Sequence, residues 1–292
     1  MSEQEKPLSK MIREFTFTLD DFKRVRTLLY DHAGISLSDS KQELVYSRLS
    51  RRLRSTGIPT FAEYIRLLET APEEEWEAFI NAMTTNLTSF FREAHHFPIL
   101  AEHMQLLYQK SKDPIKLWCS AASTGEEPYS MAMTAMEVFG SYTPPVTIIA
   151  TDLDTRVLAT AKAGVYTEER VERLDPERLK RFFLRGTGKQ AGYVKVRQEL
   201  RDIITFQQIN LLERKWDLQP PFDAIFCRNV MIYFDKATQL SILKKFAPLL
   251  RAEGLLFAGH SESFYHAEEY FQLLGKTVYQ LSPKAPGAVR QP

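Results

Sequence analysis

The sequence has few of the residues that build metal or redox sites. Among 292 residues there are two cysteines and six histidines. Cys119 and Cys227 each lie inside an apolar run rather than in a CxxC or similar spacing, so both are expected to be reduced and buried. His95 and His96 are adjacent, and adjacent residues of a helix do not point the same way. No metal site is predicted.

Long apolar runs are also missing. No segment approaches the roughly 20 apolar residues that a membrane-spanning helix needs, and the amino-terminal MSEQEKPLSK has no apolar signal segment. Apolar residues make up 44% and charged residues 26%, which is ordinary for a globular chain, and its length favours two domains. The net charge of +1 excludes a polyanion binder that acts through overall charge alone. A cytoplasmic protein without membrane insertion is predicted.

The first part of the chain has helical periodicity from about residue 18 onward. Thr18 and Asp21 form a capping box, apolar residues follow at helical spacing, and Gly34 ends the helix. Residues 1–95 are therefore predicted to form a small all-α domain. Its further helices are expected at residues 42–54, 61–69 and 74–84.

From about residue 114, short β-rich runs alternate with helical stretches. This alternation is typical of a parallel sheet covered on both faces, so residues 96–284 are predicted to form an α/β domain. A last pair of short strands, which includes residues 277–281, is expected to complete the sheet. The other strands are predicted at residues 115–120, 146–152, 203–207, 224–229 and 255–259, and helices at 126–139, 156–163 and 236–250.

One segment interrupts this alternation. Residues 186–206 carry three glycines and the alternating run from Tyr193 to Arg197, which predicts an antiparallel strand rather than a crossover helix. A small antiparallel β-subdomain is therefore expected as an insertion near residues 165–206. Residues 285–292 are expected to be a disordered tail.

Polar residues follow four of the predicted strands. In an open α/β sheet, ligands bind beyond the carboxyl ends of the strands. There the sequence places a loop of small residues at 120–125, then Asp152, Asn210 and Asn229. The loop leads into a helix amino terminus, and Asp152 can accept hydrogen bonds from both hydroxyls of a ribose.

The loop after the first strand also indicates the charge of the ligand. It lacks GxGxxG, which disfavours a dinucleotide. Glu126 and Glu127 at the helix start would repel a phosphate but suit a ligand with a sulfonium and an ammonium, as in S-adenosylmethionine. Structural alternatives remain open, since Asp152 could cap the following helix, the glutamates could complement the helix dipole, and Asn229 could cap a turn. The polar residues nevertheless occur together at four strand ends, and this coincidence favours a nucleoside-type cofactor.

Three motifs carry a family resemblance. Residues 86–93 (NLTSFFRE), 121–130 (AASTGEEPYS) and 226–234 (FCRNVMIYF) closely resemble the CheR family of chemotaxis receptor methyltransferases, and the similarity extends over about residues 18–282. The resemblance implies a Rossmann-like methyltransferase sheet, S-adenosylmethionine as cofactor and S-adenosylhomocysteine as product. It also implies that the substrates are glutamate side chains of methyl-accepting chemotaxis receptors.

The resemblance assigns roles to individual residues. Arg92 and Tyr233 are expected nearest the reacting centre as catalytic residues, although Arg92 could instead pair with Glu93 and Tyr233 could pack at the sheet edge. A glutamate carboxylate is already ionised near neutral pH, so its methylation needs no general base. The implied cofactor-binding residues are Asn86, Thr88, Arg92, Glu127, Asp152, Asn210, Leu211, Asn229 and Val230.

Two surfaces are candidates for receptor binding. The predicted helix at residues 42–54 has a basic face, which could be a solvated surface or suit nucleic acid, but the resemblance favours an acidic methylation helix of the receptor. The β-subdomain is expected to dock a carboxy-terminal receptor peptide along a strand edge, or else to be a stabilising hairpin. The expected contacts are Arg48, Arg51, Arg52 and Arg54 for the helix, and Gly188, Gly192, Val194 and Arg197 for the peptide.

Two rival functions stay open at this point. One is a methyltransferase of another acceptor such as RNA, which the basic helix alone would permit. The other is a non-catalytic adaptor that binds cofactor and receptor. The three motifs favour the receptor methyltransferase, with no nucleic acid among its partners.

Overall fold

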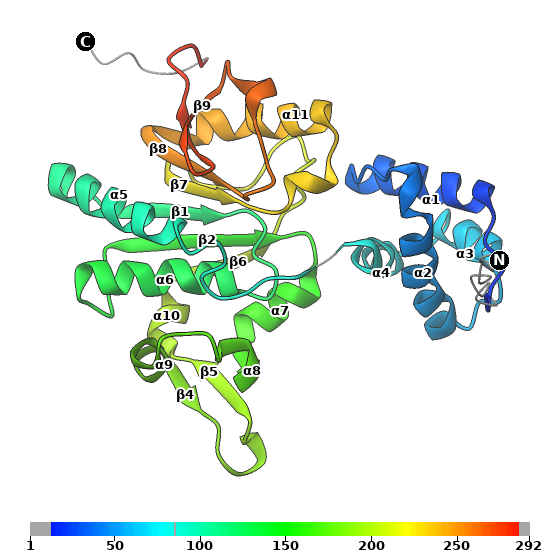
Figure 1. The fold of residues 1–292 in the computed structure, drawn as a ribbon, viewed down its shortest axis with the longest axis horizontal. Helices are drawn as coiled ribbons and strands as arrows, with labels where there is room; N and C mark the ends of the chain where they lie inside the picture. The colour runs from blue at the N-terminus through cyan, green and yellow to red at the C-terminus, as the bar shows by residue number, and fades with distance from the viewer. Residues whose placement is uncertain (1–12, 85, 286–292) are drawn as a thin grey trace, which may run out of the picture. The chain divides into compact units, whose positions relative to one another are not determined.

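The computed structural model describes residues 13–84 and 86–285. The chain divides into two compact units, residues 1–85 and residues 86–292 (Figure 1). The predicted boundary was residue 95, but the first unit ends at residue 85. The reason is that Phe90 belongs to the core of the second unit, where its ring packs edge-on against Tyr166 and Phe183 at centroid distances of 5.1 and 5.5 Å.

The first unit is all-α. It contains α1 (Leu19–Ala33), α2 (Gln42–Thr56), α3 (Phe61–Leu68) and α4 (Glu73–Met83), with a short 3-10 turn η1 (Asp39–Lys41) before α2. The capping box of Thr18 and Asp21 is confirmed, and Gly34, at φ 63°, ends α1. Apolar residues at helical spacing, among them Leu29 and Leu49, are fully buried between the helices.

A seven-stranded mixed sheet organises the second unit. Its strand order is β6-β2-β1-β7-β8-β10-β9, with parallel pairing from β6 to β8 and antiparallel pairing of β10 with β8 and β9. The predicted parallel sheet and the last pair of short strands that completes it are confirmed. The strands are β1 (Ile115–Cys119), β2 (Val146–Asp152), β6 (Ile204–Gln208), β7 (Phe222–Cys227), β8 (Leu250–Ala258), β9 (Phe271–Gly275) and β10 (Val278–Leu281).

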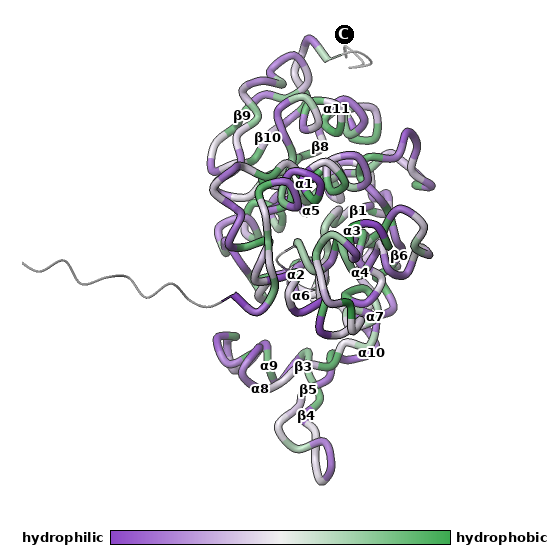
Figure 2. The backbone as a smooth tube through the Cα atoms, turned by 90° about the vertical axis from the view of Figure 1, so that its right-hand side faces the viewer, coloured by the Kyte–Doolittle hydropathy of each residue, from purple (hydrophilic) through white to green (hydrophobic). Residues whose placement is uncertain are grey.

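Helices cover both faces of this sheet. Along β1, Leu117 and Cys119 belong to one apolar cluster, whereas Trp118 between them belongs to the other. Helices α5 (His96–Ser111) and α6 (Glu126–Phe139) pack on the first face, and α11 (Lys236–Phe246) on the second. Helix α7 (Thr155–Ala163) packs beside β2 and β6. In Figure 2 the tube of α11 alternates between hydrophobic and hydrophilic colours, as expected for a helix with one buried side.

One helix was missing from the prediction, and another ends earlier than predicted. Helix α5 was not predicted from the sequence; it follows the N-cap residue His95 and carries His96 and Pro98 in its first turn, where no capping side chain marks its start. Helix α11 ends at Phe246 instead of residue 250, because Pro248 lies in a 3-10 turn (Ala247–Leu249) that leads into β8. Strand β8 therefore begins at Leu250, earlier than the predicted residue 255.

The predicted antiparallel β-subdomain is present. Its three strands have the order β3-β5-β4, where β3 is Val165–Thr167, β4 is Phe183–Arg185 and β5 is Tyr193–Val196. It ends near residue 196 rather than 206, because β6 already belongs to the large sheet. The short helices α8 (Glu168–Val171), α9 (Pro176–Phe182) and α10 (Gln198–Asp202) were not predicted, since so few residues show no period. In the described part of the chain, no helix combines the length and apolarity needed to cross a bilayer.

Candidate functional site

The loops that follow four neighbouring strands meet at one edge of the large sheet. Strands β6, β2, β1 and β7 are adjacent and parallel, so their carboxyl ends face the same way. Asn210 follows β6, Asp152 ends β2, and Asn229 follows β7, with the loop of residues 120–125 between them after β1. The structure therefore brings these strand-end residues together at the carboxyl edge of the sheet, where α/β sheets bind ligands.

Asp152 holds two of these loops in place. Its Oδ2 accepts a hydrogen bond from the Ser123 N–H at 2.8 Å, and its Oδ1 accepts one from the Asp154 N–H at 3.0 Å. The helix cap of α7 is Asp154, not Asp152, so the capping alternative for Asp152 is wrong. Burial raises the pKa of Asp152 above its ordinary value, against the opposing effect of the two backbone hydrogen bonds.

Asn86 and Thr88 lie on the segment that starts the second unit. The Asn86 side chain donates to Asp154 Oδ2 at 3.5 Å, and its backbone carbonyl accepts from Ser123 Oγ at 3.3 Å. Thr88 is half-buried on the same segment. These contacts bring the first motif beside the loops after β1 and β2.

The two glutamates at the start of α6 have different partners. Glu127 is buried, and its Oε2 accepts from Arg228 Nη1 at 2.6 Å while its Oε1 accepts from Cys119 Sγ at 3.3 Å. Burial raises the pKa of Glu127, and Arg228 opposes that rise. Glu126 is fully buried and paired with Arg170 of α8. The prediction that both glutamates face a cationic ligand is therefore wrong for Glu126, whose charge is neutralised by the β-subdomain.

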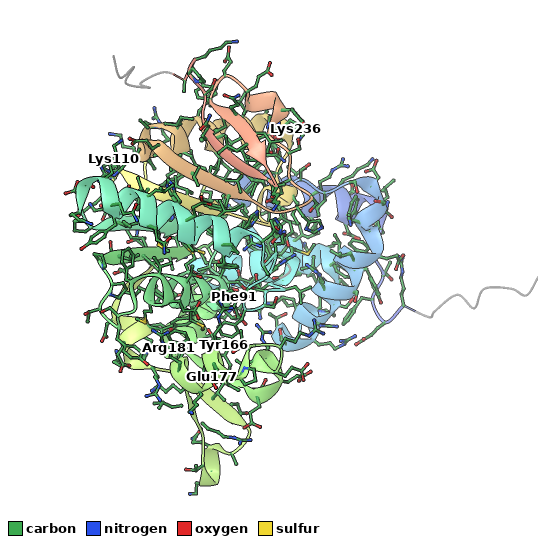
Figure 3. The ribbon with its side chains drawn as sticks, turned by 60° about the vertical axis from the view of Figure 1, so that its left-hand side comes forward. Phe91, Lys110, Tyr166, Glu177, Arg181 and Lys236 are labelled. Carbon is green, nitrogen blue, oxygen red and sulfur yellow. The ribbon has the colours of Figure 1, made fainter. Side chains whose placement is uncertain are left out.

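The β-subdomain also braces the loop after β1. The Tyr166 hydroxyl donates to the Thr124 carbonyl at 2.6 Å, and Arg170 Nη2 donates to Thr124 Oγ1 at 3.1 Å. Gly125, at φ +100°, leaves no room for a side chain, because a Cβ there would lie 2.8 Å from the Tyr166 hydroxyl. Tyr166 is labelled in Figure 3, as is Phe91. The residue before Phe91, Phe90, packs against Tyr166. Sequence reasoning missed this brace, since its two sides are about 40 residues apart.

The loop after β7 is fixed by a buried carboxylate that no sequence motif pointed to. Glu262 accepts hydrogen bonds from the backbone N–H groups of Asn229, Met231 and Gly259 at 2.9, 2.8 and 2.6 Å. Asn229 adopts φ 57°, and its side chain donates to Glu93 Oε1 at 3.4 Å. Val230 follows and is half-buried.

Several non-glycine residues in these loops have left-handed backbone conformations. Phe91, Glu93, Ser123 and Asn229 have φ between 48° and 57°. Each such residue costs about 1–3 kcal/mol and persists where the surrounding structure enforces it, which is common at ligand sites. The concentration of these residues in three loops marks the same edge of the sheet.

The remaining predicted site residues are distributed around that edge. Arg92 Nη1 donates to the Leu87 carbonyl at 2.8 Å, and Glu93 pairs with Arg228 and His260, so the alternative of an Arg92–Glu93 pair is wrong. Tyr233 is half-buried in a 3-10 turn η3 (Met231–Tyr233).

Hydrogen bonds to side chains and backbone hold the segment after β6. Asn210 Oδ1 accepts from the Leu212 N–H at 2.9 Å, and the Asn210 carbonyl accepts from Trp216 Nε1 at 3.0 Å. The carbonyl of the buried Leu211 accepts from Lys245 Nζ at 2.6 Å. These bonds fix the backbone beside the Asn210 side chain.

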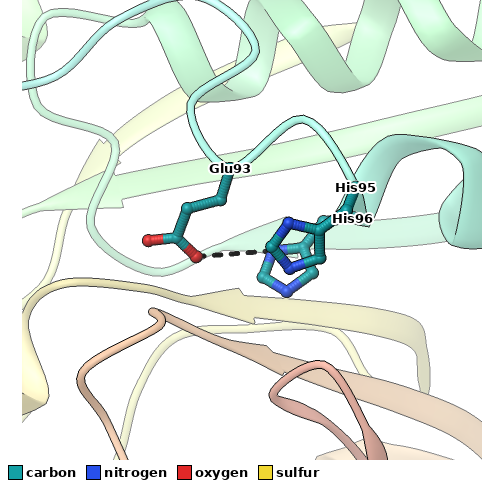
Figure 4. A group of neighbouring side chains, drawn as sticks. All are labelled: Glu93, His95 and His96. Atoms are coloured by element: carbon teal, nitrogen blue, oxygen red, sulfur yellow. Dashed lines mark ion pairs between the residues drawn. The ribbon is translucent and has the colours of Figure 1, made fainter.

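Glu93, His95 and His96 bring potential metal ligands within 4.8 Å of one another (Figure 4). The prediction that the adjacent histidines point apart is wrong, because their rings are only 4.3 Å apart at the start of α5. Burial would raise the pKa of Glu93, but His260 and the Arg228 guanidinium, 3.3 Å away, lower it to about 2. Since the Arg228 guanidinium already pairs with this carboxylate, the cluster disfavours a metal ion.

The same cluster predicts a dependence of stability on pH. His96 is fully buried, and burial, followed by the charge of Arg228, lowers its pKa to about 4, below the value of about 6.5 in an unfolded chain. A depressed histidine pKa stabilises the fold above pH 6.5, and this contribution is lost as the pH falls towards 4. From pH 7 to pH 5 the free energy of unfolding is expected to fall by about 2 kcal/mol through His96.

Urea unfolding at both pH values measures this change. His96→Gln can still donate to the Lys276 carbonyl, which His96 Nε2 contacts at 2.9 Å, but does not titrate. An equally large fall in the free energy of unfolding of this variant would assign the effect to other groups.

The basic face of α2 is largely engaged within the first unit. Arg48 donates to the carbonyls of Met83 and Thr84 at 2.5 and 3.1 Å, Arg52 makes two hydrogen bonds with Glu75, and Arg54 pairs with Glu14 at 2.7 Å. Arg51 is exposed on the same helix. The basic residues of α2 could be identified from the sequence, but their partners could not, because the partners are distant along the chain.

The predicted peptide-docking residues occupy the turn and central strand of the β-subdomain. Gly188 and Gly192 have positive φ between β4 and β5, and Arg197 follows β5 with its N–H bonded to Phe182. Val194 is buried in β5, which has strands on both sides. The open edges belong to β3 and β4 instead.

Comparison with known proteins gives matches over both units. A family model described as "CheR methyltransferase, SAM binding domain" matches residues 86–280, and "CheR methyltransferase, all-alpha domain" matches residues 20–84. Chemotaxis protein methyltransferase 2 of Pseudomonas aeruginosa is 54% identical over 267 residues, which cover 91% of this chain and 95% of the relative. The chemotaxis protein methyltransferase of Escherichia coli is 50% identical over 276 residues, 94% of this chain and 95% of the relative. That of Salmonella typhimurium is 49% identical over 282 residues, 96% of each.

Proposed function

The chain belongs to the CheR methyltransferase family and is an S-adenosylmethionine-dependent chemotaxis methyltransferase, and from this premise we propose that it esterifies specific glutamate side chains of chemotaxis receptors. The observation that carries the proposal is the edge of the sheet where Asp152, Glu127, Asn210 and Asn229 converge. The reaction would give a glutamate methyl ester and S-adenosylhomocysteine.

The residues at this edge fit the cofactor. The Asp152 carboxylate, oriented by two backbone N–H groups, suits the ribose hydroxyls, and the buried Glu127 carboxylate suits the ammonium of the methionine end. S-adenosylmethionine supplies a methyl group on a sulfonium, which is a good electrophile. The other proposed cofactor-binding residues are Asn86, Thr88, Arg92, Asn210, Leu211, Asn229 and Val230.

The chemistry demands positioning rather than proton transfer. A glutamate carboxylate is ionised near neutral pH, so no general base is required. We assign to Arg92 the orientation of the acceptor carboxylate, since the contact with the Leu87 carbonyl leaves further N–H donors on its guanidinium. Tyr233 is proposed to donate a hydrogen bond at the reacting centre. Alignment of the reactants and exclusion of water can together contribute several kcal/mol.

The acceptor is proposed to lie on an acidic methylation helix of the receptor, which the basic face of α2 would attract. Because Arg48, Arg52 and Arg54 have partners within the first unit, the exposed Arg51 is proposed as the main contact. The protein is proposed to act in the cytoplasm, without nucleic acid or membrane insertion.

Charge reversal on α2 separates docking from stability. Arg51→Glu is expected to raise the KM for a receptor fragment about 10-fold through repulsion of its acidic helix, with cofactor affinity and unfolding unchanged. Arg52→Glu removes the guanidinium bound by the partly buried Glu75 and is expected to lower the free energy of unfolding by about 2 kcal/mol. Steady-state kinetics and urea unfolding of both variants give the two readouts. An unchanged KM in Arg51→Glu would exclude this face as the receptor contact.

The β-subdomain is proposed to tether a carboxy-terminal receptor peptide by adding a strand to β3 or β4. Gly188, Gly192, Val194 and Arg197 would then shape this subdomain, with the peptide on an open edge rather than on β5. Receptor fragments with and without their carboxy-terminal peptide test the tether. Equal methylation rates for both fragments would contradict it.

The proposal is tested against its two rivals by one assay. Purified protein is incubated with labelled S-adenosylmethionine and either a receptor signalling fragment or structured RNA. We expect label in the receptor fragment alone. Label in RNA would support the other acceptor, and cofactor binding without label in either acceptor would support the adaptor.

A further inference from the structure

Arg228 occupies a central position among the loops of the active site. It follows Cys227 at the carboxyl end of β7, and its side chain is fully inaccessible to solvent. Its Nη1 donates to Glu127 Oε2 at 2.6 Å. Its Nη2 donates to the Arg92 carbonyl at 2.5 Å and lies 3.3 Å from Glu93 Oε2. One guanidinium thus connects the start of α6, the segment of the first motif and the loop after β7.

The charges around Arg228 are mainly acidic. Glu127 and Glu93 contact it directly, and His260 Nδ1 donates to Glu93 Oε1 at 3.0 Å. Glu262 is a further nearby carboxylate, and it accepts hydrogen bonds from backbone N–H groups, including that of Asn229. The remaining titratable neighbours are His95, His96, Cys119 and Cys227.

Glu127 depends on this cation. A buried carboxylate without a positive partner takes up a proton instead of remaining charged. Its other hydrogen bond comes from the Cys119 thiol, a weak donor. Without Arg228, the carboxylate proposed to meet the ammonium of the cofactor would therefore become neutral near physiological pH.

We propose that Arg228 is a positioning residue that fixes the Glu127 carboxylate and the Arg92 main chain for the cationic end of S-adenosylmethionine. This inference rests on the proposed cofactor site. Both terminal nitrogens of Arg228 donate to protein oxygens, so its action on the cofactor passes through Glu127 and Arg92. The two carboxylates and one guanidinium give the cluster a net charge of −1, which complements a cofactor with two cationic groups and one carboxylate.

A purely structural ion pair would stabilise the fold without altering the ligand site. The matched control is Arg251, which pairs with the buried Asp223 at 2.8 Å near the opposite, amino-terminal end of β7. Arg228→Met and Arg251→Met each leave a buried carboxylate without its cation. The first change lies beside the proposed site, and the second lies away from it.

Calorimetric titration with S-adenosylmethionine between pH 6 and pH 9 tests the proposal. We expect Arg228→Met to bind about 10- to 100-fold more weakly than wild type at pH 7, in line with losses at residues that orient ligand-binding groups. The affinity of this variant should rise towards pH 9, because its Glu127 is protonated near pH 7 and must lose that proton before the cofactor binds. Arg228→Lys should recover part of the affinity, and Arg251→Met should match wild type at every pH.

A double variant covers the case in which Arg228→Met does not fold. Glu127→Gln imitates the neutral carboxyl group, so it already removes the charge that Arg228 is proposed to hold. Arg228→Lys should therefore weaken binding less in the Glu127→Gln background than in the wild-type background. Wild-type affinity and a flat pH profile in Arg228→Met, or full additivity in the double variant, would overturn the proposal. Failure of the wild-type protein to bind S-adenosylmethionine would instead refute the cofactor site itself.

Discussion

Replacing Asp152 with alanine is expected to weaken binding of S-adenosylmethionine about 100-fold. The change removes the acceptor proposed for the ribose hydroxyls, and charge-assisted hydrogen bonds contribute about 1.5–3 kcal/mol each. It also frees the Ser123 N–H and the Asp154 N–H, which the Asp152 carboxylate now holds at 2.8 and 3.0 Å. Isothermal titration calorimetry gives the dissociation constant directly.

Asp175 provides the control for this change. It caps α9 in the β-subdomain by accepting from the Glu177 N–H at 2.9 Å, and it is exposed. Asp175→Ala should lose a helix cap but retain cofactor affinity. If Asp152→Ala bound the cofactor within about threefold of wild type, the ribose would have to bind elsewhere.

Replacing Arg92 with methionine is expected to lower kcat for receptor methylation by about 100- to 1000-fold, the usual effect of losing one oriented donor at a reacting centre. Its carbonyl would still accept from Arg228, so the backbone of the site should persist. Cofactor affinity is expected to fall by less than kcat, because Arg92 is proposed to serve the acceptor carboxylate as well as the cofactor.

Quench-flow or steady-state assays with a receptor fragment measure kcat, and calorimetry measures cofactor affinity. Arg92→Lys keeps the charge but loses the planar fork, so it should recover only part of kcat. Equal losses of kcat and of cofactor affinity in Arg92→Met would restrict Arg92 to cofactor binding.

The strands of the large sheet were predictable because their signals are local. Short β-rich runs, helical stretches between them and polar residues at the strand ends all lie within a few residues of one another. Asp152, Asn210 and Asn229 could be selected in this way without knowledge of their contacts. The parallel pairing then followed from the alternation of β-rich runs with helical stretches.

The electrostatic framework of the site could not be predicted from the sequence. Arg228 and Glu127 are 101 residues apart, and Glu126 meets Arg170 only because the β-subdomain folds back onto the loop after β1. For the same reason, the sequence of α2 shows its arginines but does not show that Arg52 pairs with Glu75. Charge patterns identify candidate surfaces, whereas the choice between an internal partner and an external one depends on the tertiary fold.

The chemical nature of the product is the central test of the proposed function. The receptor fragment is labelled with radioactive S-adenosylmethionine, purified and treated with mild base, and the volatile label is counted. A glutamate methyl ester releases its label as methanol, and glutamine in place of the modified glutamates should abolish labelling. Label that stays on the receptor in base would show methylation of another group and would contradict a carboxylate acceptor.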